Sequence, residues 1–343
     1  MARHFTRGTS IFSRSSSIKL PPTFQQLTPQ DNEKREVRIF YFHGLTLDGK
    51  SPLDNPVEGS PTRWLRWLEN GELGDGQRAI IYVASYEQYV SDYGSSGRVD
   101  LYLLGEQLFK GIMDVLKTSR NGTVKDDGTG RDETVGHVIL IGHSFGGLAI
   151  KQVILEAAES ILDPGLFFLR RLAGVFFFST PHLGSAKLTR LLDKGKNLGA
   201  ALAALGKVTD RLNSQFMERR KALGIPTAAL FESEVTKMGN FNELVVSEAS
   251  ARMDVDIAAK IPETDHFSIC SISDQSDKRF IFLRNQINKW ILDSHSSIKG
   301  RAPSDSTVDP TTRTDYQLEC YPEEGPGNET TQSRDEIAIP MPE

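Results

Sequence analysis

The segment His137-Val138-Ile139-Leu140-Ile141-Gly142-His143-Ser144-Phe145-Gly146-Gly147 decides the fold of this chain. Its first part, 137–141, is a short apolar run, which is typical of a parallel strand covered on both faces. The next residues fit the pattern G-x-S-x-G, in which a serine occupies a strained turn between a strand and a helix. Residues 145–159 are predicted to form that helix. The segment therefore predicts a strand, a sharp turn carrying Ser144 and a helix in direct succession.

Strands and helices are predicted to alternate on both sides of this segment. Short runs of β-branched, aromatic and other apolar residues predict strands at 37–42, 79–84, 174–178, 227–231 and 243–246. Apolar residues at helical spacing predict amphipathic helices over 100–118 and 279–293. This alternation predicts an α/β protein with a mainly parallel central sheet flanked by helices.

The 343 residues divide into three zones of unlike composition. Residues 1–33 are basic and rich in serine, which predicts either a disordered tail or an organelle transit peptide. Residues 34–295 contain the predicted strands and helices, with a small helical cap expected at about 186–224. Residues 296–343 are acidic and poor in aromatic residues, which predicts disorder. We therefore expect one α/β domain between two unlike tails.

Composition and charge exclude several classes of protein. The chain is 38% hydrophobic and 25% charged, which excludes collagen, coiled coils and a wholly disordered chain. The net charge of −5 argues against a nucleic-acid partner. The two cysteines, Cys270 and Cys320, suit neither a zinc site nor a disulfide framework, and we predict no metal and no cofactor. No apolar run approaches the roughly 20 residues of a membrane-spanning helix.

A serine hydroxyl is a weak nucleophile, so Ser144 would need a general base and an acid that orients the base. In a fold of this kind the chain order is serine, acid, histidine. Three histidines follow Ser144, and His295 lies beyond the last predicted helix, which leaves His182 and His266. His266 comes after the last predicted strands, where the base is expected. His182 is then expected to shape the pocket or to be a structural histidine.

Three carboxylates are candidates for the acid. Glu232 directly follows the predicted strand 227–231, where the acid is usually placed, and it ranks first. Glu248 follows the next predicted strand and ranks second. Asp265 adjoins His266, but adjacent residues rarely point the same way. We therefore expect Asp265 to be solvated or to hold its own loop.

The turn after the first predicted strand has two competing interpretations. In the first, the backbone N–H groups of Leu45 and Phe145 together form an oxyanion hole. In the second, residues 44–51 form a phosphate-binding loop, because they match G-x-x-x-x-G-K-[ST]. Such a loop must lead into a helix, and Pro56 would fall in the interior of that helix. We therefore expect a polar loop at the rim of the site rather than a nucleotide site.

The predicted cap also has two interpretations. The apolar stretch 198–205 fits either a mobile lid over an acyl-binding pocket or an ordinary helix packed on the sheet, and the second is slightly favoured. Near the end of the cap, Arg219, Arg220 and Lys221 form a basic cluster. We expect this cluster to be a solvated face rather than a site for lipid headgroups.

Taken together, these residues resemble the lipase-like α/β-hydrolases of the SERAC1-like and DUF676 serine-esterase families. The resemblance covers about residues 37–293. Its carriers are Phe42-His43-Gly44-Leu45, Trp64, the segment 142–152, the segment 174–185 with its Thr-Pro-His-Leu-Gly-Ser string, Glu232, the segment 246–251 and Asp265-His266. The resemblance implies the α/β-hydrolase fold, with Ser144 as nucleophile, His266 as base and Glu232 as acid. One departure is the long insertion 46–61, where the family has a short link.

The resemblance also implies an activity and a location. The implied activity is that of a carboxylic ester hydrolase, lipase-like or esterase-like, which cleaves a lipid or another ester through an acyl-enzyme. A role in phospholipid metabolism and peripheral association with mitochondrial or endoplasmic-reticulum membranes are implied as well. The alternatives are a cytoplasmic location, and a catalytically weak hydrolase-like scaffold that binds a lipid or a protein partner.

Overall fold

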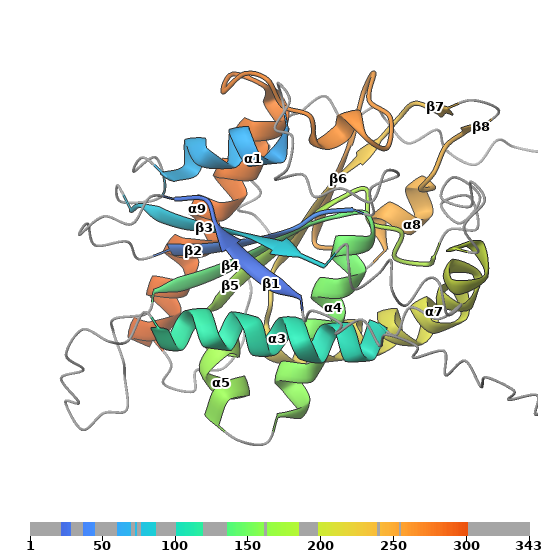
Figure 1. Cartoon of the computed structure of the whole chain (residues 1–343). Helices are drawn as coiled ribbons and strands as arrows, with labels where there is room; N and C mark the ends of the chain where they lie inside the picture. The colour runs from blue at the N-terminus through green and yellow to red at the C-terminus, as the bar shows by residue number, and fades with distance from the viewer. Residues whose placement is uncertain are drawn as a thin grey trace, which may run out of the picture. The chain divides into compact units, whose positions relative to one another are not determined.

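Figure 1 shows the computed structural model of the chain. It describes residues 22–28, 37–44, 60–69, 73, 77–86, 101–118, 136–160, 163–184, 198–238, 241–253 and 255–300. The predictions for residues 1–21 and 301–343 therefore lie outside the described residues, as does most of the phosphate-loop pattern.

A seven-stranded sheet forms the centre of the fold, in the order β1-β3-β2-β4-β5-β6-β9 (Figure 1). Its strands are β1 (Thr23–Gln26), β2 (Val37–Phe42), β3 (Ala79–Ser85), β4 (His137–His143), β5 (Leu172–Phe178), β6 (Thr227–Glu232) and β9 (Ile257–Ile261). Neighbouring strands pair in parallel except for β1, which runs antiparallel to β3. The predicted α/β class with a mainly parallel sheet is confirmed.

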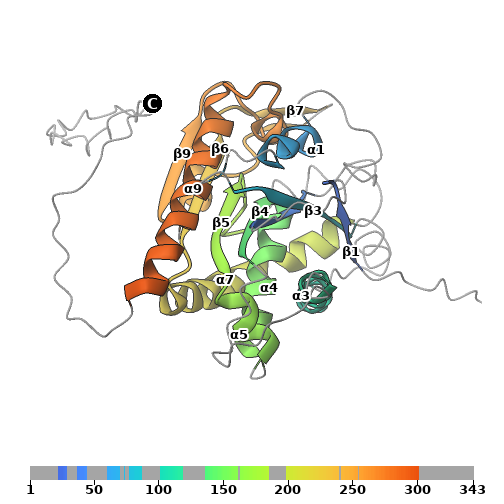
Figure 2. The same ribbon diagram turned by 90° about the vertical axis from the view of Figure 1, so that its left-hand side faces the viewer.

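Helices cover both faces of this sheet, as Figure 2 shows. They are α1 (Pro61–Trp64), α3 (Leu101–Thr118), α4 (Phe145–Glu159), α5 (Asp163–Leu169), α7 (Leu198–Leu223), α8 (Glu248–Arg252) and α9 (Lys278–Gly300), with the short 3-10 helices η1 (Leu65–Glu69) and η3 (Ser268–Cys270). One apolar cluster joins one sheet face to α3, α4, α5 and α7. A second cluster joins the opposite face to α1, η1, η3 and α9. The result is a three-layer α/β arrangement.

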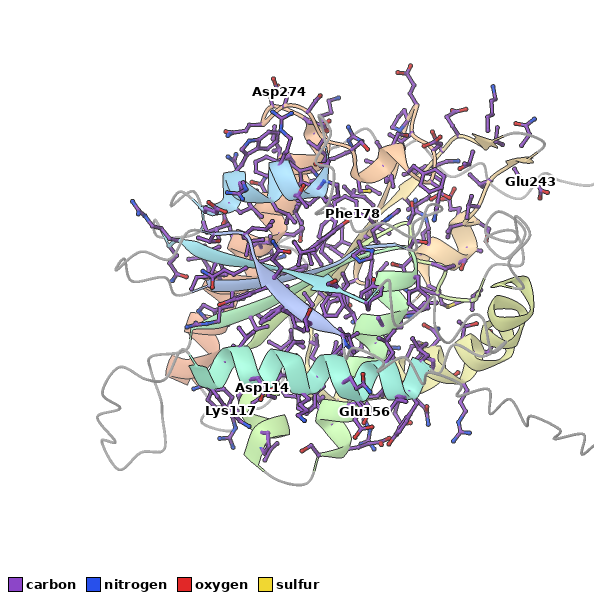
Figure 3. All side chains as sticks on the ribbon, in the orientation of Figure 1. Asp114, Lys117, Glu156, Phe178, Glu243 and Asp274 are labelled. Atoms are coloured by element: carbon purple, nitrogen blue, oxygen red, sulfur yellow. The ribbon has the colours of Figure 1, made fainter. Side chains whose placement is uncertain are left out.

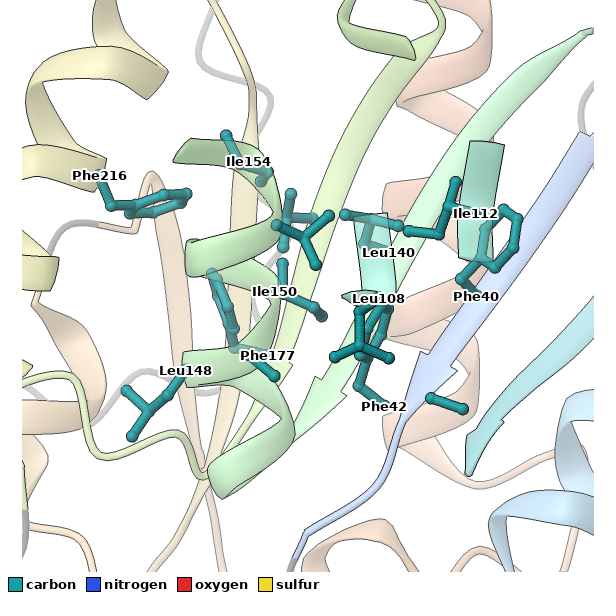
Figure 4. Packing of buried hydrophobic residues seen from close by; sticks show 14 of the residues in the cluster. Phe40, Phe42, Leu108, Ile112, Leu140, Leu148, Ile150, Ile154, Phe177 and Phe216 are labelled. Carbon is teal, nitrogen blue, oxygen red and sulfur yellow. The ribbon is translucent and has the colours of Figure 1, made fainter. Parts of the chain in front are cut away.

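Burial on both faces explains why the central strands are apolar throughout. In β2, Phe40 and Phe42 belong to the cluster with α3 and α4, whereas the intervening Tyr41 belongs to the cluster with α9. Figure 4 shows the first cluster, in which Leu140 of β4 packs among side chains of α3 and α4 such as Ile112 and Ile150. Successive residues of a strand point to opposite faces, so both kinds of position must be apolar here.

The prediction of a strand at 243–246 is wrong. Residues Phe241–Glu243 form β8, which pairs only with β7 (Thr236–Met238) in a separate two-stranded sheet. Val245 and Val246 are buried because they pack into the apolar cluster of α3 and α4. The strand that follows β6 in the main sheet is instead β9, whose residues are half-buried or exposed and carry little apolar signal.

Residues 22–28, which we expected in the N-terminal tail, contain the edge strand β1. Phe24 packs edge-on against the rings of Phe40 and Phe42 at 5.1 and 5.7 Å. The hydroxyl of Thr28 accepts a hydrogen bond from the N–H of Ile81 at 2.8 Å. At the other end, α9 continues to Gly300, beyond the predicted boundary at residue 295. The ordered domain therefore extends past both predicted boundaries.

The described part of the predicted cap is the helix α7, and its second half packs on the sheet. Phe216 is buried with its ring edge-on to Phe177 of β5 at 6.3 Å. The ammonium of Lys151, buried in α4, donates to Asn213 Oδ1 and lies 5.2 Å from the centre of the Phe216 ring. These contacts fit the interpretation of a packed helix for residues 209–223. Residues 185–197 lie outside the described part of the chain.

The expectation of a solvated basic face at the end of the cap is wrong for Arg220. Its guanidinium is buried and donates to Asp256 Oδ1 at 2.9 Å and to the carbonyl of Ile225 at 3.4 Å. Asp256 also accepts from the N–H of Thr227 at 2.7 Å. Arg220 therefore ties the end of α7 to the starts of β6 and β9, and only its neighbours Arg219 and Lys221 are exposed.

No helix within the described ranges combines the length and the apolar character needed to cross a membrane.

Candidate active site

Ser144 lies in a sharp turn between β4 and α4. Its backbone angles are φ 51° and ψ −121°, in a region that is strained for a residue with a side chain. The N–H of Ser144 donates to the carbonyl of Phe178 at 2.9 Å, which holds the turn against the end of β5. Phe178 lies in the interior of the fold, as Figure 3 shows. The turn thus presents Ser144 at the carboxyl ends of the central strands.

Gly146 allows the backbone of β2 to pass directly against the first turn of α4. A Cβ atom at Gly146 would lie 2.1 Å from the carbonyl oxygen of Phe42 and 2.7 Å from that of His43. Both atoms belong to the main chain, which cannot move aside without disturbing the sheet. A side chain at Gly146 is therefore incompatible with the close approach of strand and helix.

Gly146→Ala is expected to lower the free energy of unfolding by about 3 kcal/mol because the added methyl group overpacks this contact. Alanine is the better helix former by about 1 kcal/mol, so the steric effect must exceed the gain in propensity. Thermal unfolding would measure the change. The matched control is Gly111→Ala in α3, where the nearest atoms belong to the ring of Phe24 at 3.1 Å. Equal losses in the two variants would contradict the expectation.

The structure brings Ser144, His266 and Glu232 together in one chain of hydrogen bonds. Ser144 Oγ lies 2.8 Å from His266 Nε2, and His266 Nδ1 lies 3.3 Å from Glu232 Oε1. Each residue is at most 2% exposed to solvent. A neutral His266 with its proton on Nδ1 would donate to Glu232 and accept from the serine hydroxyl. This is the geometry of a serine nucleophile with its base and orienting acid.

Glu232 is held by several donors at the end of β6. Its Oε1 also accepts from the N–H of Val246 at 2.8 Å, and its own N–H donates to Ser179 Oγ at 3.2 Å. Burial raises the pKa of Glu232, but the hydrogen bond and charge of His266, with the Ser179 and Val246 bonds, outweigh it. The pKa therefore lies below its ordinary value. Glu232 is consequently an ionised carboxylate at neutral pH, as an orienting acid requires.

The loop that carries His266 is built around the side chain of Asp265. Asp265 Oδ1 accepts from the N–H groups of Phe267 at 3.1 Å and Ser268 at 2.8 Å, and from Ser268 Oγ at 2.7 Å. The N–H of His266 donates to Thr236 Oγ1 at 3.2 Å. Asp265 therefore holds its own loop, which was one of the two roles expected for it.

The alternative acid Glu248 is not part of this group. It is the first residue of α8, half exposed, and it pairs with Arg252 at 2.7 Å and Lys260 at 3.6 Å. His182 is buried, and its ring packs edge-on to Phe177 at 4.8 Å. Burial, followed by the charges of Lys151 and Arg220, lowers the pKa of His182 well below its ordinary value. Among the described residues neither ring nitrogen of His182 has a hydrogen-bond partner, so its role stays a prediction.

Of the two predicted oxyanion donors, the structure describes Phe145 but not Leu45. Phe145 is the first residue of α4, and it is buried. The first N–H groups of a helix have no acceptor within the helix, so the N–H of Phe145 can bind an oxyanion next to Ser144. Leu45 lies outside the described residues, directly after Gly44, and its role stays a prediction.

Two residues support the site in roles that the sequence analysis did not predict. Ser179 has a positive φ of 41° and accepts from the backbone of Glu232, and Thr236 accepts from the backbone of His266. Ser179 lies within the segment 174–185 that carries the resemblance, but nothing in the sequence indicates these roles, because both residues act through backbone groups that only the folded chain brings near. Within the described ranges, no cluster of histidine, cysteine and carboxylate side chains is suited to hold a metal ion.

Comparisons of sequence link the chain to lipase-like proteins. Residues 129–285 match the family model of lecithin:cholesterol acyltransferase. The chain is 24% identical over 286 residues to protein SERAC1 of Danio rerio, which is 77% of this chain and 40% of that protein. It is 30% identical over 145 residues to protein SERAC1 of Mus musculus, which is 39% of this chain and 21% of that protein. The chain thus spans less than half the length of these relatives.

Comparison of structures identifies the fold. Phospholipase PlaB from Legionella pneumophila is similar with a TM-score of 0.51 and 15% sequence identity, over 77% of this chain and 64% of that chain. A seven-stranded, mainly parallel sheet with helices on both faces and a serine in the turn after a central strand is the α/β-hydrolase fold. The predicted fold is confirmed, and so is the resemblance to SERAC1-like, lipase-like proteins, whereas the link to DUF676 stays a prediction.

Proposed function

We propose that this SERAC1-like, lipase-like α/β-hydrolase is a serine hydrolase that cleaves carboxylic esters of lipid-like substrates. The observation that carries the proposal is the buried chain of hydrogen bonds from Ser144 through His266 to Glu232, with distances of 2.8 and 3.3 Å. The strained backbone of Ser144 adds support, because such strain is typical of nucleophiles in this kind of turn.

The geometry suits reaction in two stages. In the first, Ser144 Oγ attacks the acyl carbon while His266 Nε2 takes its proton, and Glu232 stabilises the imidazolium that forms. The N–H groups of Phe145 and Leu45 hold the oxyanion. The intermediate expels the alcohol, which takes the proton from His266, and the acyl group stays on Ser144. In the second stage, His266 Nε2 takes a proton from water, which attacks the acyl carbon. The bond from the acyl carbon to Ser144 Oγ then breaks, Oγ takes the proton back from His266, and the acid leaves.

The lipid character of the substrate is supported by the match of residues 129–285 to the lecithin:cholesterol acyltransferase model. The name of that family also suggests a second candidate function, in which an alcohol rather than water accepts the acyl group from Ser144. The two functions share every step up to the acyl-enzyme. Adding a sterol or another long-chain alcohol to the assay would separate them, because transfer yields a new ester and hydrolysis yields a free acid.

The test of the main proposal measures hydrolysis of p-nitrophenyl esters with acyl chains from 4 to 16 carbons, and of phosphatidylcholine vesicles. A fluorophosphonate probe would report the reactive serine independently of substrate choice. Hydrolysis that rises with acyl-chain length would support a lipid-like substrate. If the wild-type chain neither reacts with the probe nor hydrolyses any ester, the scaffold alternative replaces the proposal.

We further propose peripheral association with mitochondrial or endoplasmic-reticulum membranes and a role in phospholipid metabolism, on the basis of the resemblance to SERAC1-like proteins. Fractionation of cells that express the full chain, followed by carbonate extraction of the membranes, would test the association. Recovery of the protein in the cytosolic fraction alone would favour the cytoplasmic alternative.

A further inference from the structure

His143, the variable residue before the serine in the motif, contacts the main chain of His266. His143 Nε2 lies 2.9 Å from the carbonyl oxygen of His266, and His143 is buried. A carbonyl oxygen can only accept, so Nε2 of His143 must carry the proton. The two imidazole rings lie 5.2 Å apart and are tilted by 41°. His143 therefore reaches across from the end of β4 to the loop of the proposed base.

The opposite side of the His143 ring meets the turn after β2. A Cβ atom built on Gly44 would lie 2.8 Å from His143 Nδ1 and 3.1 Å from Cε1 of the same ring. Gly44 directly precedes Leu45, the predicted second oxyanion donor. One buried ring thus touches both the loop that carries His266 and the segment that leads to the oxyanion hole.

His143 is held in its neutral form. Burial, and next the positive charge of His266, lower the pKa of His143 to about 3, and His43 acts in the same direction. Glu232 and the bond to the carbonyl of His266 oppose this shift but do not overcome it. A neutral ring with its proton on Nε2 leaves Nδ1 bare, on the side that faces Gly44. It also places no second positive charge beside the imidazolium that His266 would become.

We infer that His143 is a positioning residue, which fixes the main chain of His266 and sets its spacing from the turn at Gly44. The main chain of His266 is then held at both ends, because its N–H donates to Thr236 Oγ1 at 3.2 Å and its carbonyl accepts from His143 at 2.9 Å. With both ends fixed, the ring of His266 can face Ser144 and Glu232 at once. The inference rests on the proposed function, in which His266 is the base.

The first test compares His143→Phe with His143→Gln. Phenylalanine keeps a flat ring but loses the donor, whereas the glutamine side chain keeps an N–H of similar reach. His143→Phe is expected to lower kcat by about 10- to 100-fold with little change in KM, because small misplacement of a reacting group is costly. His143→Gln is expected to recover most of this loss. Equal kcat in His143→Phe and wild type, or equal losses in both variants, would overturn the inference.

The pH profile separates positioning from a general loss of folded protein. In His143→Phe, the low-pH limb of kcat/KM is expected to shift, because the main chain of His266 is no longer held and its bond to Glu232 changes. The groups that face His143 and could affect this limb are His266, Glu232 and His43, and none of them is changed in the variant. A limb that stays in place while kcat falls in proportion to the folded fraction would show a structural role only.

A second test needs no activity and therefore separates this inference from the proposed function. Nitrogen-15 NMR of labelled histidines is expected to show His143 with its proton on Nε2 from pH 5 to 8. The Nδ1 proton of His266, bonded to Glu232, is expected far downfield in wild type and His143→Gln, and absent in His143→Phe. An unchanged His266 signal in His143→Phe would overturn the inference even in an active enzyme. The expected signals in an inactive wild type would contradict the proposed function alone.

Discussion

Ser144→Ala is expected to lower kcat for ester hydrolysis by about 10⁴-fold or more, because it removes the oxygen that forms the acyl-enzyme in the proposed mechanism. The substitution deletes one buried oxygen and leaves His266 and Glu232 in place. Circular dichroism should therefore show a folded protein, and binding of a lipid should persist. Steady-state kinetics, together with labelling by the fluorophosphonate probe, would measure the loss.

The matched control for Ser144→Ala is Ser214→Ala. Ser214 lies on the exposed side of α7, and its hydroxyl donates to the carbonyl of Asp210 one turn earlier. Wild-type kinetics and full labelling are expected for this variant. If Ser144→Ala were labelled to the same extent as Ser214→Ala, the nucleophile would have to be another residue, and the proposed mechanism would fail.

Glu232→Gln is expected to lower kcat by about 10³- to 10⁴-fold, with a smaller effect on KM. The carboxylate accepts from His266 Nδ1, which keeps the proton there and leaves Nε2 free to accept from Ser144. A glutamine amide can turn its NH₂ group toward Nδ1 and stabilise the opposite tautomer. In that tautomer His266 cannot take the serine proton. Kinetics across pH 5 to 9 would measure the loss.

Glu248→Gln is the matched control for the acid, since it makes the same chemical change at the rival position. Glu248 is half exposed and pairs with Arg252 and Lys260, so its replacement is expected to change kcat by less than about 2-fold. The opposite result, with a large loss for Glu248→Gln and little loss for Glu232→Gln, would transfer the role of the acid to Glu248.

The centre of the fold and the candidate site could be predicted because their signals are local. Four apolar residues, Val138 to Ile141, are followed at once by the glycines and serine of the turn, so strand, turn and helix are specified within one short segment. The expected order of serine, acid and histidine along the chain then favoured Glu232 as the acid and His266 as the base. That Glu232 meets His266, and His266 meets Ser144, depends on the register of β4, β5 and β6, which no local pattern specifies.

The edges of the sheet could not be predicted because little of their surface is buried. Strand β9 is Ile257-Ala258-Ala259-Lys260-Ile261, and each of its residues is half-buried or exposed, so it does not form the long run of large apolar side chains that marks the central strands. The prediction at 243–246 failed for the opposite reason, since Val245 and Val246 are apolar but lie in an irregular segment. The backbone of Val246 donates to Glu232 instead of to a neighbouring strand. A run of apolar residues indicates that a segment is buried, but burial alone does not distinguish a strand from a packed loop.

The edge strand β1 limits how the N-terminus can be processed. Thr23 to Gln26 pair with β3, whose sequence Ala-Ile-Ile-Tyr-Val-Ala-Ser contains no charged residue. Without β1, this uncharged strand would become an open edge that can recruit another chain. A recombinant form that starts at residue 30 is therefore expected to aggregate, and one that starts at residue 20 to stay monodisperse in size-exclusion chromatography. A cleavage that preserves the whole of this pairing must fall before Thr23.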